Sequence, residues 1–501
     1  MRTPILATRR MSRSLLASAF LLACCFLADP GAQSAIITIA SRDLAGVGFN
    51  DATPVAPVGG NAGTTLGEQR RNVYRYVADI WEKALESQAT ITVSAGWEAL
   101  TCTANSAVLG SAGAWNLWHD FPGGRPGTWY HQALANKLAS TDLSANTPDD
   151  GSGFGNVDIK TQFNVNLGNN DCLAGSPFYL GLDGKAGTKV NFVETLLHEL
   201  GHGLGFSVLS VNTSTGNRIS ADGSVFSPTG LPGVWEAFMY DNSTNKTWLA
   251  MTATERKVSA VNPLKLAWTG VNAVGSASLL AKTPVLQTAS PAAGGSGLYA
   301  YFAAAFGPAI ITPSAFGTLA NVAYQPGESG PGCDALNAAN LAAVAGKVAI
   351  VGRGACSFVI KVKNAQNAGA IGVILANSDA AITTPGGADP TITIPSALVS
   401  KSDGEALKAA VATAVRYGSR RSPGIVMGSW SVDPARIAGA DAQGRPLLYT
   451  PATLAPGSSV SHWDVSATPN LLMEPNINID LGLILVAPKD LTVPLLKDIG
   501  W

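Results

Sequence analysis

The chain is poor in charged residues, and this scarcity narrows what it can bind. Of its 501 residues, 13% are Asp, Glu, Lys or Arg, and the formal net charge is −1. A nucleic-acid partner requires a basic face that neutralises phosphates, which this composition does not supply. Small residues dominate instead, with 54 glycines, as is typical of a loop-rich exported protein. We therefore expect no nucleic-acid partner.

Long apolar runs are scarce as well, apart from one near the N-terminus. Three arginines precede an apolar run at residues 15–28, which small residues follow. The run is shorter than the ~20 residues that span a bilayer, so it predicts a signal peptide, residues 1–35, cleaved after Ala32 or Ala35. A faint lipoprotein-like box before Cys24 leaves lipidation open. We expect a secreted, extracellular monomer whose mature form has no membrane span.

Cysteine is equally scarce. Loss of the signal peptide leaves Cys102, Cys172, Cys333 and Cys356. An even number of cysteines in an exported chain favours disulfides, and three pairings are formally possible. Proximity in the sequence favours Cys102 with Cys172 and Cys333 with Cys356. The alternative is four buried thiols.

Only five histidines occur, and two of them form a motif. Residues 198–206 read His-Glu-Leu-Gly-His-Gly-Leu-Gly-Phe. Histidines four positions apart lie on one face of a helix, so His198 and His202 can bind one Zn²⁺ ion. Zinc lowers the pKa of a bound water toward ~7, and Glu199 lies where it can take that proton and pass it to the leaving amine of a peptide. The motif predicts zinc-dependent peptide hydrolysis.

The residues around the motif predict a buried, capped helix. Asn191 can cap the helix N-terminus, with Glu194 three positions later. Gly203 and Gly205 are costly inside a helix, so we expect the helix to end there. An apolar stripe comprises Val193, Leu196, Leu197, Leu200 and Leu204.

A catalytic zinc ion has three protein ligands and one open position, so a third ligand is needed. In the common extended motif of the metzincin peptidases, the third histidine follows the second by six positions, where this chain has Val208. Far downstream, Ser461-His462-Trp463-Asp464 precedes Leu471-Leu472-Met473-Glu474-Pro475. This order of motifs resembles leishmanolysin-like metzincins, in which an insertion separates the helix from the third histidine.

That resemblance implies a fold and a ligand set. It implies an α+β metzincin-like zinc peptidase core with a twisted sheet and an active-site helix. His462 would be the third ligand of one zinc ion per chain, and Met473 would lie in the methionine-bearing turn beneath it. Polypeptide substrates would pair with an edge strand. The insertion is longer here than in leishmanolysin, and the overall likeness is to bacterial secreted metallopeptidases with a Leu-x-Asp-Ile-Gly-Trp tail.

Other residues compete for these roles. Glu236 is a rival third ligand, as in thermolysin-like gluzincins, although the Asn-Glu-x-x-x-Asp pattern is absent. We interpret His119 and His131, both beside aromatic residues, as structural histidines. The Gly-, Asn- and Asp-rich stretch at 143–175 leaves calcium possible, but no EF-hand spacing supports it.

The insertion has a pattern of its own. Residues 347–351 and 371–376 predict strands on either side of an amphipathic helix at 357–368, which makes a βαβ element. The run Gly-Lys-Val-Ala-Ile-Val-Gly-Arg-Gly-Ala-Cys-Ser-Phe from residue 346 resembles a protease-associated domain, closely over 332–376 and more loosely over 275–418. Such domains often carry a disulfide where Cys333 and Cys356 stand, and the resemblance implies a lid, substrate-access or protein-binding role.

The sequence thus predicts a metallopeptidase core at 36–274 and 419–501, interrupted by an α/β protease-associated domain at 275–418. The predicted function is that of a secreted zinc metalloendopeptidase with Glu199 as general base. Two alternatives stay open: a surface binding or matrix protein with a structural or vestigial zinc site, and a zinc amidase acting on cell-wall peptides.

Overall fold

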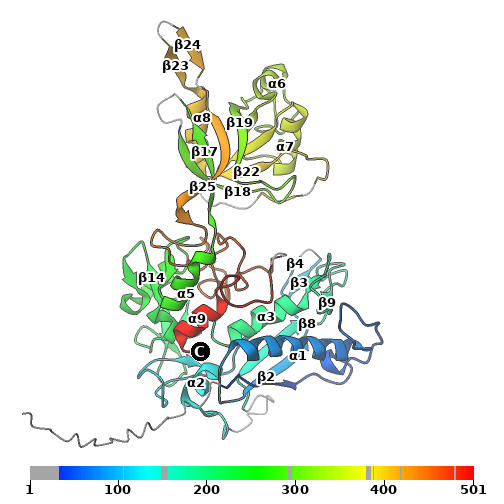
Figure 1. The fold of residues 1–501 in the computed structure, drawn as a ribbon, viewed down its shortest axis with the longest axis vertical. Helices are drawn as coiled ribbons and strands as arrows, with labels where there is room; N and C mark the ends of the chain where they lie inside the picture. The colour runs from blue at the N-terminus through cyan, green and yellow to red at the C-terminus, as the bar shows by residue number, and fades with distance from the viewer. Residues whose placement is uncertain are drawn as a thin grey trace, which may run out of the picture.

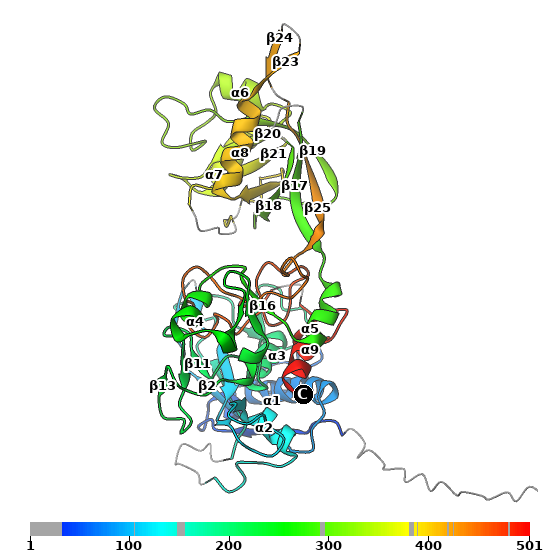
Figure 2. The same ribbon diagram turned by 90° about the vertical axis from the view of Figure 1, so that its left-hand side faces the viewer.

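The computed structural model describes residues 33–104, 106–147, 156–290, 296–379, 385–387, 389–417, 420–423, 425–478 and 481–501. Residues 1–32 of the predicted signal peptide, Cys24 among them, lie outside this part of the chain. Figures 1 and 2 show two lobes, the larger built from both ends of the described chain and the smaller from the segment between them. No helix among the described residues is long and apolar enough to cross a membrane.

A mixed sheet forms the base of the larger lobe. Its strand order is β1-β2-β8-β5, with β1 at Ile37–Ser41, β2 at Ile91–Glu98, β8 at Ile159–Asn164 and β5 at Gly110–Ala114. The first three strands are parallel, whereas β5 runs antiparallel to β8, with Ala112 opposite Thr161. Because β5 pairs with β8 alone, it is an edge strand of this sheet.

Two long helices pack on the sheet and on each other. Helix α1, Leu66–Ala84, begins at a capping box between Thr65 and Glu68, and helix α3, Phe192–Gly203, begins at Asn191. Their apolar faces meet in one core with the strands. Figure 1 shows the two helices side by side above the sheet. This packing holds α3, which carries the zinc motif, against α1 and the sheet.

Short elements complete the larger lobe. Its remaining helices are α2 (Gln132–Ala139), α4 (Ala253–Ser259), α5 (Val271–Ser276) and α9 (Thr492–Ile499). Its remaining strands are β3 (Cys102–Thr103), β4 (Ser106–Ala107), β6 (Leu117–Trp118), β7 (Tyr130–His131), β9 (Phe178–Tyr179), β10 (Val190–Asn191), β11 (Val211–Asn212), β12 (Asn217–Ile219), β13 (Phe226–Ser227), β14 (Met239–Asp241), β15 (Lys246–Thr247) and β16 (Leu266–Trp268). The segment after the barrel lobe, brown in Figures 1 and 2, runs as loops along the side nearest that lobe.

The smaller lobe is a closed barrel with flanking helices, and we call it the barrel lobe. Its strand order is β17-β18-β22-β21-β20-β19-β25. The strands are β17 (Lys282–Ala289), β18 (Gly297–Ala303), β19 (Ser314–Asn321), β20 (Val348–Gly352), β21 (Gly372–Ala376), β22 (Ser396–Val399) and β25 (Met427–Ile437). The helices are α6 (Ala338–Val344), α7 (Phe358–Asn367) and α8 (Lys401–Ala412), and a hairpin joins β23 (Ala414–Tyr417) to β24 (Arg420–Pro423). The predicted βαβ element is present as β20, α7 and β21, with its strands parallel.

The lobe boundary differs from the predicted one at 275–418. Strand β25 lies beyond residue 418 yet pairs with β17 and β19, so the barrel extends to Ile437. At the other end, Ala277 is buried and Leu280 packs in the core of the larger lobe. Both ends of the barrel lobe therefore lie later in the chain than predicted. The C-terminal end differs because the strands that pair with β25 are far from it in the sequence.

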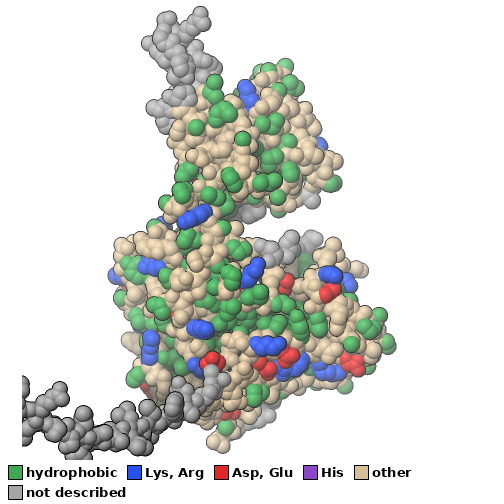
Figure 3. Space-filling view, in the orientation of Figure 1, with side chains coloured by type: hydrophobic (Ala, Val, Ile, Leu, Met, Phe, Trp, Pro, Cys, Tyr) green, Lys and Arg blue, Asp and Glu red, His purple; other side chains and the backbone are tan. Residues whose placement is uncertain are grey.

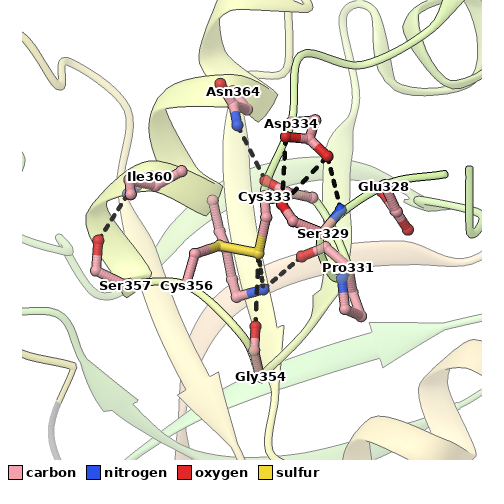
Figure 4. The surroundings of a disulfide bond; sticks show 12 residues. Glu328, Ser329, Pro331, Cys333, Asp334, Gly354, Cys356, Ser357, Ile360 and Asn364 are labelled. Carbon is pink, nitrogen blue, oxygen red and sulfur yellow. Dashed lines mark hydrogen bonds between the residues drawn. A yellow bond between two sulfur atoms is a disulfide. The ribbon is translucent and has the colours of Figure 1, made fainter.

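Two disulfides occur, with the pairing that proximity in the sequence favoured. Cys102 bonds Cys172 in the larger lobe, and Cys333 bonds Cys356 in the barrel lobe. Figure 4 shows the second bond between the loop at Cys333 and the turn before α7, with the carbonyl oxygens of Pro331 and Gly354 nearby. Each bond fastens a loop that precedes or follows a core strand.

Candidate metal centre

Helix α3 presents its histidines on a face that points away from the apolar core. The Asn191 side chain accepts a hydrogen bond from the Val193 N–H at 3.1 Å, as the sequence predicted for the cap, although Glu194 takes no part in that bond. The predicted apolar stripe is buried, so one face of the helix is committed to packing. His198 and His202 share the opposite face with Glu199.

Three glycines shape the last turn of the helix and the turn after it. A side chain at Gly201 would come within 2.7 Å of the Met473 sulfur, so glycine lets that buried methionine pack against the helix. Helix α3 ends at Gly203, as predicted, and Gly205 has a φ of +120°, a conformation that favours glycine. The chain therefore turns sharply and brings the Phe206 carbonyl back to His202.

The structure brings three histidines together. The Nε2 atom of His202 lies 3.1 Å from Nε2 of His198 and 3.1 Å from Nε2 of His462. The three ligand atoms lie within 4.8 Å of one another. Within the described residues, they are the one group of three or more His, Cys, Asp or Glu side chains with this closeness.

The hydrogen bonds of the rings set the direction of their lone pairs. Each Nδ1 faces a backbone carbonyl: His198 that of Leu472 at 2.7 Å, His202 that of Phe206 at 2.7 Å, and His462 that of Ser458 at 2.9 Å. A carbonyl only accepts, so each Nδ1 carries the ring proton and each Nε2 presents a lone pair. Three lone pairs at this spacing repel one another unless a cation lies among them, so the residues fit a metal ion.

Burial keeps these rings neutral. It lowers the pKa of His198 to about 4, and burial together with the charge of His198 lowers the pKa of His462 to about 3. The pKa of His202 lies well below its usual value, first because of burial and then because of the two other rings. Neutral imidazole with a fixed tautomer is the form that binds zinc.

The loop that carries His462 is held from several sides. The Trp463 N–H donates to the Met473 carbonyl at 2.8 Å, which closes the chain between the third histidine and the methionine. Asp490 is buried and accepts from the Leu472 N–H at 2.8 Å, next to the carbonyl that orients His198. These bonds hold the segment from His462 to Met473 against helix α3, where the Met473 sulfur faces Gly201.

Asp490 is a supporting residue that the sequence analysis missed. Its carboxylate also accepts from the Thr492 N–H at 2.7 Å, at the start of α9. An Asp beside a helix start is a local signal that the sequence does show. Its bond to Leu472 crosses to a separate loop and has no such signal.

Glu199 lies beside the histidines with an altered acidity. Its side chain is partly exposed at the cleft, and burial raises its pKa to about 8, against a lowering hydrogen bond from the backbone N–H of Ala112 in β5. This bond ties the carboxyl to the edge strand. A carboxyl with a pKa near neutrality is suited to taking and returning a proton.

The rival residues are engaged elsewhere. Both oxygens of Glu236 have partners, since Oε2 accepts from Arg218 Nε at 2.8 Å and Oε1 from the Gly233 N–H at 2.9 Å. His131 is buried against Ser207, with 2.9 Å between Nε2 and the hydroxyl oxygen, and His119 contacts Asp120. None of the three joins the group of close ligand atoms.

A cleft of about 890 Å³ opens above the histidines and Glu199. One wall is residues 107–112, which include the first half of β5, and another is the chain after α3 at 207–214. The third wall comes from the loops around His462, residues 454–462 and 475–477. The three histidines therefore lie where a bound molecule can reach them.

Comparisons with known proteins identify a domain in the barrel lobe. A family model described as PA domain matches residues 315–407, which run from β19 into α8. The barrel lobe therefore contains a protease-associated domain, and the protein is a mixed α+β protein that carries one. No curated protein matches the chain.

Solved structures match the chain only in part. A zinc aminopeptidase from Bacillus subtilis is 21% identical over 33% of this chain and 38% of its own, with a TM-score of 0.20. An aminopeptidase from Aneurinibacillus sp. strain AM-1 is 18% identical over 40% and 42%, also at 0.20. A psychrophilic subtilisin-like protease from the Antarctic psychrotroph Pseudoalteromonas sp. AS-11 is 16% identical over 30% and 35%, again at 0.20. The chain spans about two fifths of the length of the first two, and a TM-score of 0.20 carries no information on the larger lobe.

Proposed function

We propose that the protein is a secreted zinc-dependent endopeptidase of the leishmanolysin-like metzincin type. The observation that carries the proposal is the convergence of three histidine lone pairs, with Glu199 beside them, on the floor of an open cleft. Three ligands suit a catalytic zinc ion, because structural zinc sites are closed by four. The order of motifs, with His462 and Met473 after a long insertion, supports the metzincin type.

Zinc held by His198, His202 and His462 would supply an activated water and a Lewis acid for the scissile carbonyl. Glu199 takes the proton of the attacking water and gives it to the nitrogen of the leaving amine. The Ala112 N–H keeps the carboxyl of Glu199 in place between these transfers. The carbonyls at Leu472, Phe206 and Ser458 hold the three rings in the tautomer that this role requires.

The edge strand supports an extended peptide as substrate. Strand β5 lines the cleft, and only its inner edge pairs, with β8. A peptide laid along the outer edge can form main-chain hydrogen bonds in the manner of an added strand. Its scissile bond would then pass over the histidines.

The cleft suits internal peptide bonds better than chain ends. An aminopeptidase needs an acidic group for the substrate's terminal ammonium, and a carboxypeptidase needs a basic group for the terminal carboxylate. Among the described residues that line the cleft, Glu199 is the sole acidic side chain, and no Lys or Arg is present. Since Glu199 is committed to proton transfer, the cleft offers no anchor for either terminus.

Secretion rests on the N-terminal pattern and on the two disulfides, which form in oxidising compartments. A purely structural zinc site is disfavoured because such a site is closed by four protein ligands and needs no base, whereas three histidines meet here with Glu199 beside them. A zinc amidase shares the same metal chemistry, and the edge strand β5 along the cleft favours an extended polypeptide.

The test is the variant Glu199→Gln, which keeps the size and removes the proton acceptor. We expect unchanged zinc content and a fall of about 10²–10⁴-fold in the rate of casein digestion. Glu194→Gln, on the first turn of the same helix and outside the cleft lining, is the matched control and should digest casein at the wild-type rate. A Glu199→Gln variant that digests casein at the wild-type rate would overturn the proposal.

A further inference from the structure

The lining of the cleft is almost free of charge. Among the described residues that line it, Glu199 is the one side chain of the Asp, Glu, Lys and Arg types. Apart from Glu199 and the three histidines, the lining side chains are apolar, small, hydroxyl or amide groups. Apart from Glu199, the described part of the walls therefore carries no Asp, Glu, Lys or Arg side chain.

Charge is not absent from the larger lobe as a whole. In the face shown in Figure 3, most of the Lys, Arg, Asp and Glu side chains lie over the larger lobe, away from the barrel lobe. Several of them form ion pairs on that lobe, such as Arg42 with Glu98 and Lys246 with Glu255. The neutrality of the cleft is therefore a local feature, which the low charge of the chain alone does not explain.

Apolar side chains lie on all three walls, and four of them serve as examples. Val108 precedes β5 on one wall, and Leu209 follows α3 on a second. Leu454 and Ile477 belong to the third. Val108 is 47% exposed and Leu209 36% exposed, so both present apolar surface to whatever fills the cleft.

A charged substrate side chain meets an unfavourable environment on such walls. It gives up water on entering, and a neutral lining returns neither an ion pair nor a charge-assisted hydrogen bond. An apolar side chain gains from the same transfer. Because the penalty comes from lost hydration, it applies to both signs of charge, and salt screens it little.

We propose that the cleft selects uncharged, mainly apolar residues on both sides of the scissile bond and rejects acidic and basic residues alike. The proposal rests on the peptidase function proposed above. It assigns the specificity to Val108, Leu209, Leu454 and Ile477, which form the neutral walls. The natural substrates are then apolar stretches of unfolded or loosely packed polypeptides.

The first experiment maps cleavage in a mixture of peptides from digested casein and cell protein, with the zinc-loaded enzyme. Lys, Arg, Asp and Glu should be depleted within two positions of the cuts. The best substrate is then made with one flanking apolar residue replaced by Lys or by Asp. We expect kcat/KM to fall at least about tenfold for both, in low salt and in 0.5 M NaCl.

The second experiment introduces a charged side chain into the wall of the cleft. Leu209→Arg should improve cleavage of the Asp-containing peptide about tenfold relative to the Lys-containing one, whereas the uncharged control Leu209→Gln should not. Val108→Lys with its control Val108→Gln repeats the test on the opposite wall, in case the first pair folds poorly.

The outcomes separate the two proposals. Cleavage with equal rates for charged and uncharged peptides, or a preference for one sign of charge, overturns the neutral-cleft proposal and leaves the peptidase proposal intact. Rejection of acidic peptides alone also overturns it, because repulsion from Glu199 then explains the result. No cleavage of any peptide by protein shown to hold zinc overturns the peptidase function itself.

Discussion

The metal centre of the larger lobe and the buried lysine of the barrel lobe hold their polar groups in opposite ways. At the metal centre, three neutral histidines direct lone pairs at one another, and no described residue is shown donating a hydrogen bond to them. In the barrel lobe, Lys361 is 0% exposed, and its ammonium donates to the Pro331 carbonyl and lies 3.5 Å from the Cys333 sulfur. The buried ammonium of the barrel lobe therefore has a hydrogen-bond acceptor within its own lobe. The three Nε2 atoms of the larger lobe, by contrast, require a bound ion. This difference indicates that the metal-binding site belongs to the larger lobe, whereas Lys361 has a structural role in the barrel lobe.

The strongest test of this difference between the lobes is to remove one buried polar group from each of them. His462→Ala leaves two imidazoles, so we expect zinc content and casein digestion to fall to background, because two ligands hold zinc poorly. Lys361→Met removes the buried ammonium of the barrel lobe and should leave both readings at the wild-type level. Metal analysis and a casein assay on the two purified variants decide the matter.

His119→Ala is a control within the larger lobe, because His119 contacts Asp120 and does not join the metal group. It should retain zinc and activity. If His462→Ala keeps its zinc, the third ligand lies elsewhere; if Lys361→Met loses activity, the division of labour between the lobes is wrong.

Chelation should destabilise one lobe only. Zinc that binds the folded state alone stabilises it by about 4 kcal/mol at a thousandfold excess over its Kd. The lobes have separate cores, so calorimetry should show two transitions. We expect a chelator to lower the Tm of the larger lobe by roughly 10 °C and to leave that of the barrel unchanged. A common shift of both transitions would show that the lobes unfold as one unit.

The two disulfides should contribute differently to the free energy of unfolding, because they close chain segments of different length. Cys102 and Cys172 are 70 residues apart, whereas Cys333 and Cys356 are 23 apart. Loop entropy gives about 4 kcal/mol for the first bond and about 3 kcal/mol for the second. Paired Cys→Ser variants, followed by denaturant unfolding of each lobe, measure both. The reverse order would mean that native contacts outweigh chain entropy at these sites.

The smallest expected effect is a dependence on pH that belongs to the larger lobe. Asp158 is buried and bonded to the Thr92 N–H and to Asn136, and burial raises its pKa to about 7. The folded state therefore holds this proton more tightly than the unfolded chain, whose aspartate titrates near ~3.9. The contribution of Asp158 to the stability of the lobe should fall as the pH rises from about 4 to about 7, by on the order of a few kcal/mol, and then level off. The buried histidines, whose pKa values are lowered, contribute in the opposite direction, so the effect is measured as the difference between wild type and a variant at Asp158.

Asp158→Asn should remove that slope. The measurement is denaturant unfolding of both proteins at pH 5 and pH 8 with a chelator present, so that release of zinc does not contribute. The barrel-lobe transition serves as an internal reference. If the difference in stability between wild type and Asp158→Asn is the same at pH 5 and at pH 8, the assignment is contradicted.

Local sequence patterns anticipated much of the site. The spacing of His198 and His202 follows from helix geometry, and the cap at Asn191 and the helix end near Gly203 are local signals that the structure bears out. The βαβ element of the barrel follows from strand and helix periodicity. The predicted positions of His462 and Met473 came from resemblance alone, since no local rule connects residues about 260 positions apart.

By itself, the sequence determined the ingredients: a capped helix with two imidazoles and a carboxyl, four cysteines in two neighbouring pairs, and a βαβ insertion. Only the tertiary structure decided that the Nε2 atoms of three histidines meet, that Asp490 supports the loop beneath His198, and that β25 closes the barrel. Helix periodicity and capping act over a few residues and can be read from the chain. Contacts between distant segments depend on how the whole core packs, and only the folded chain shows which of them form.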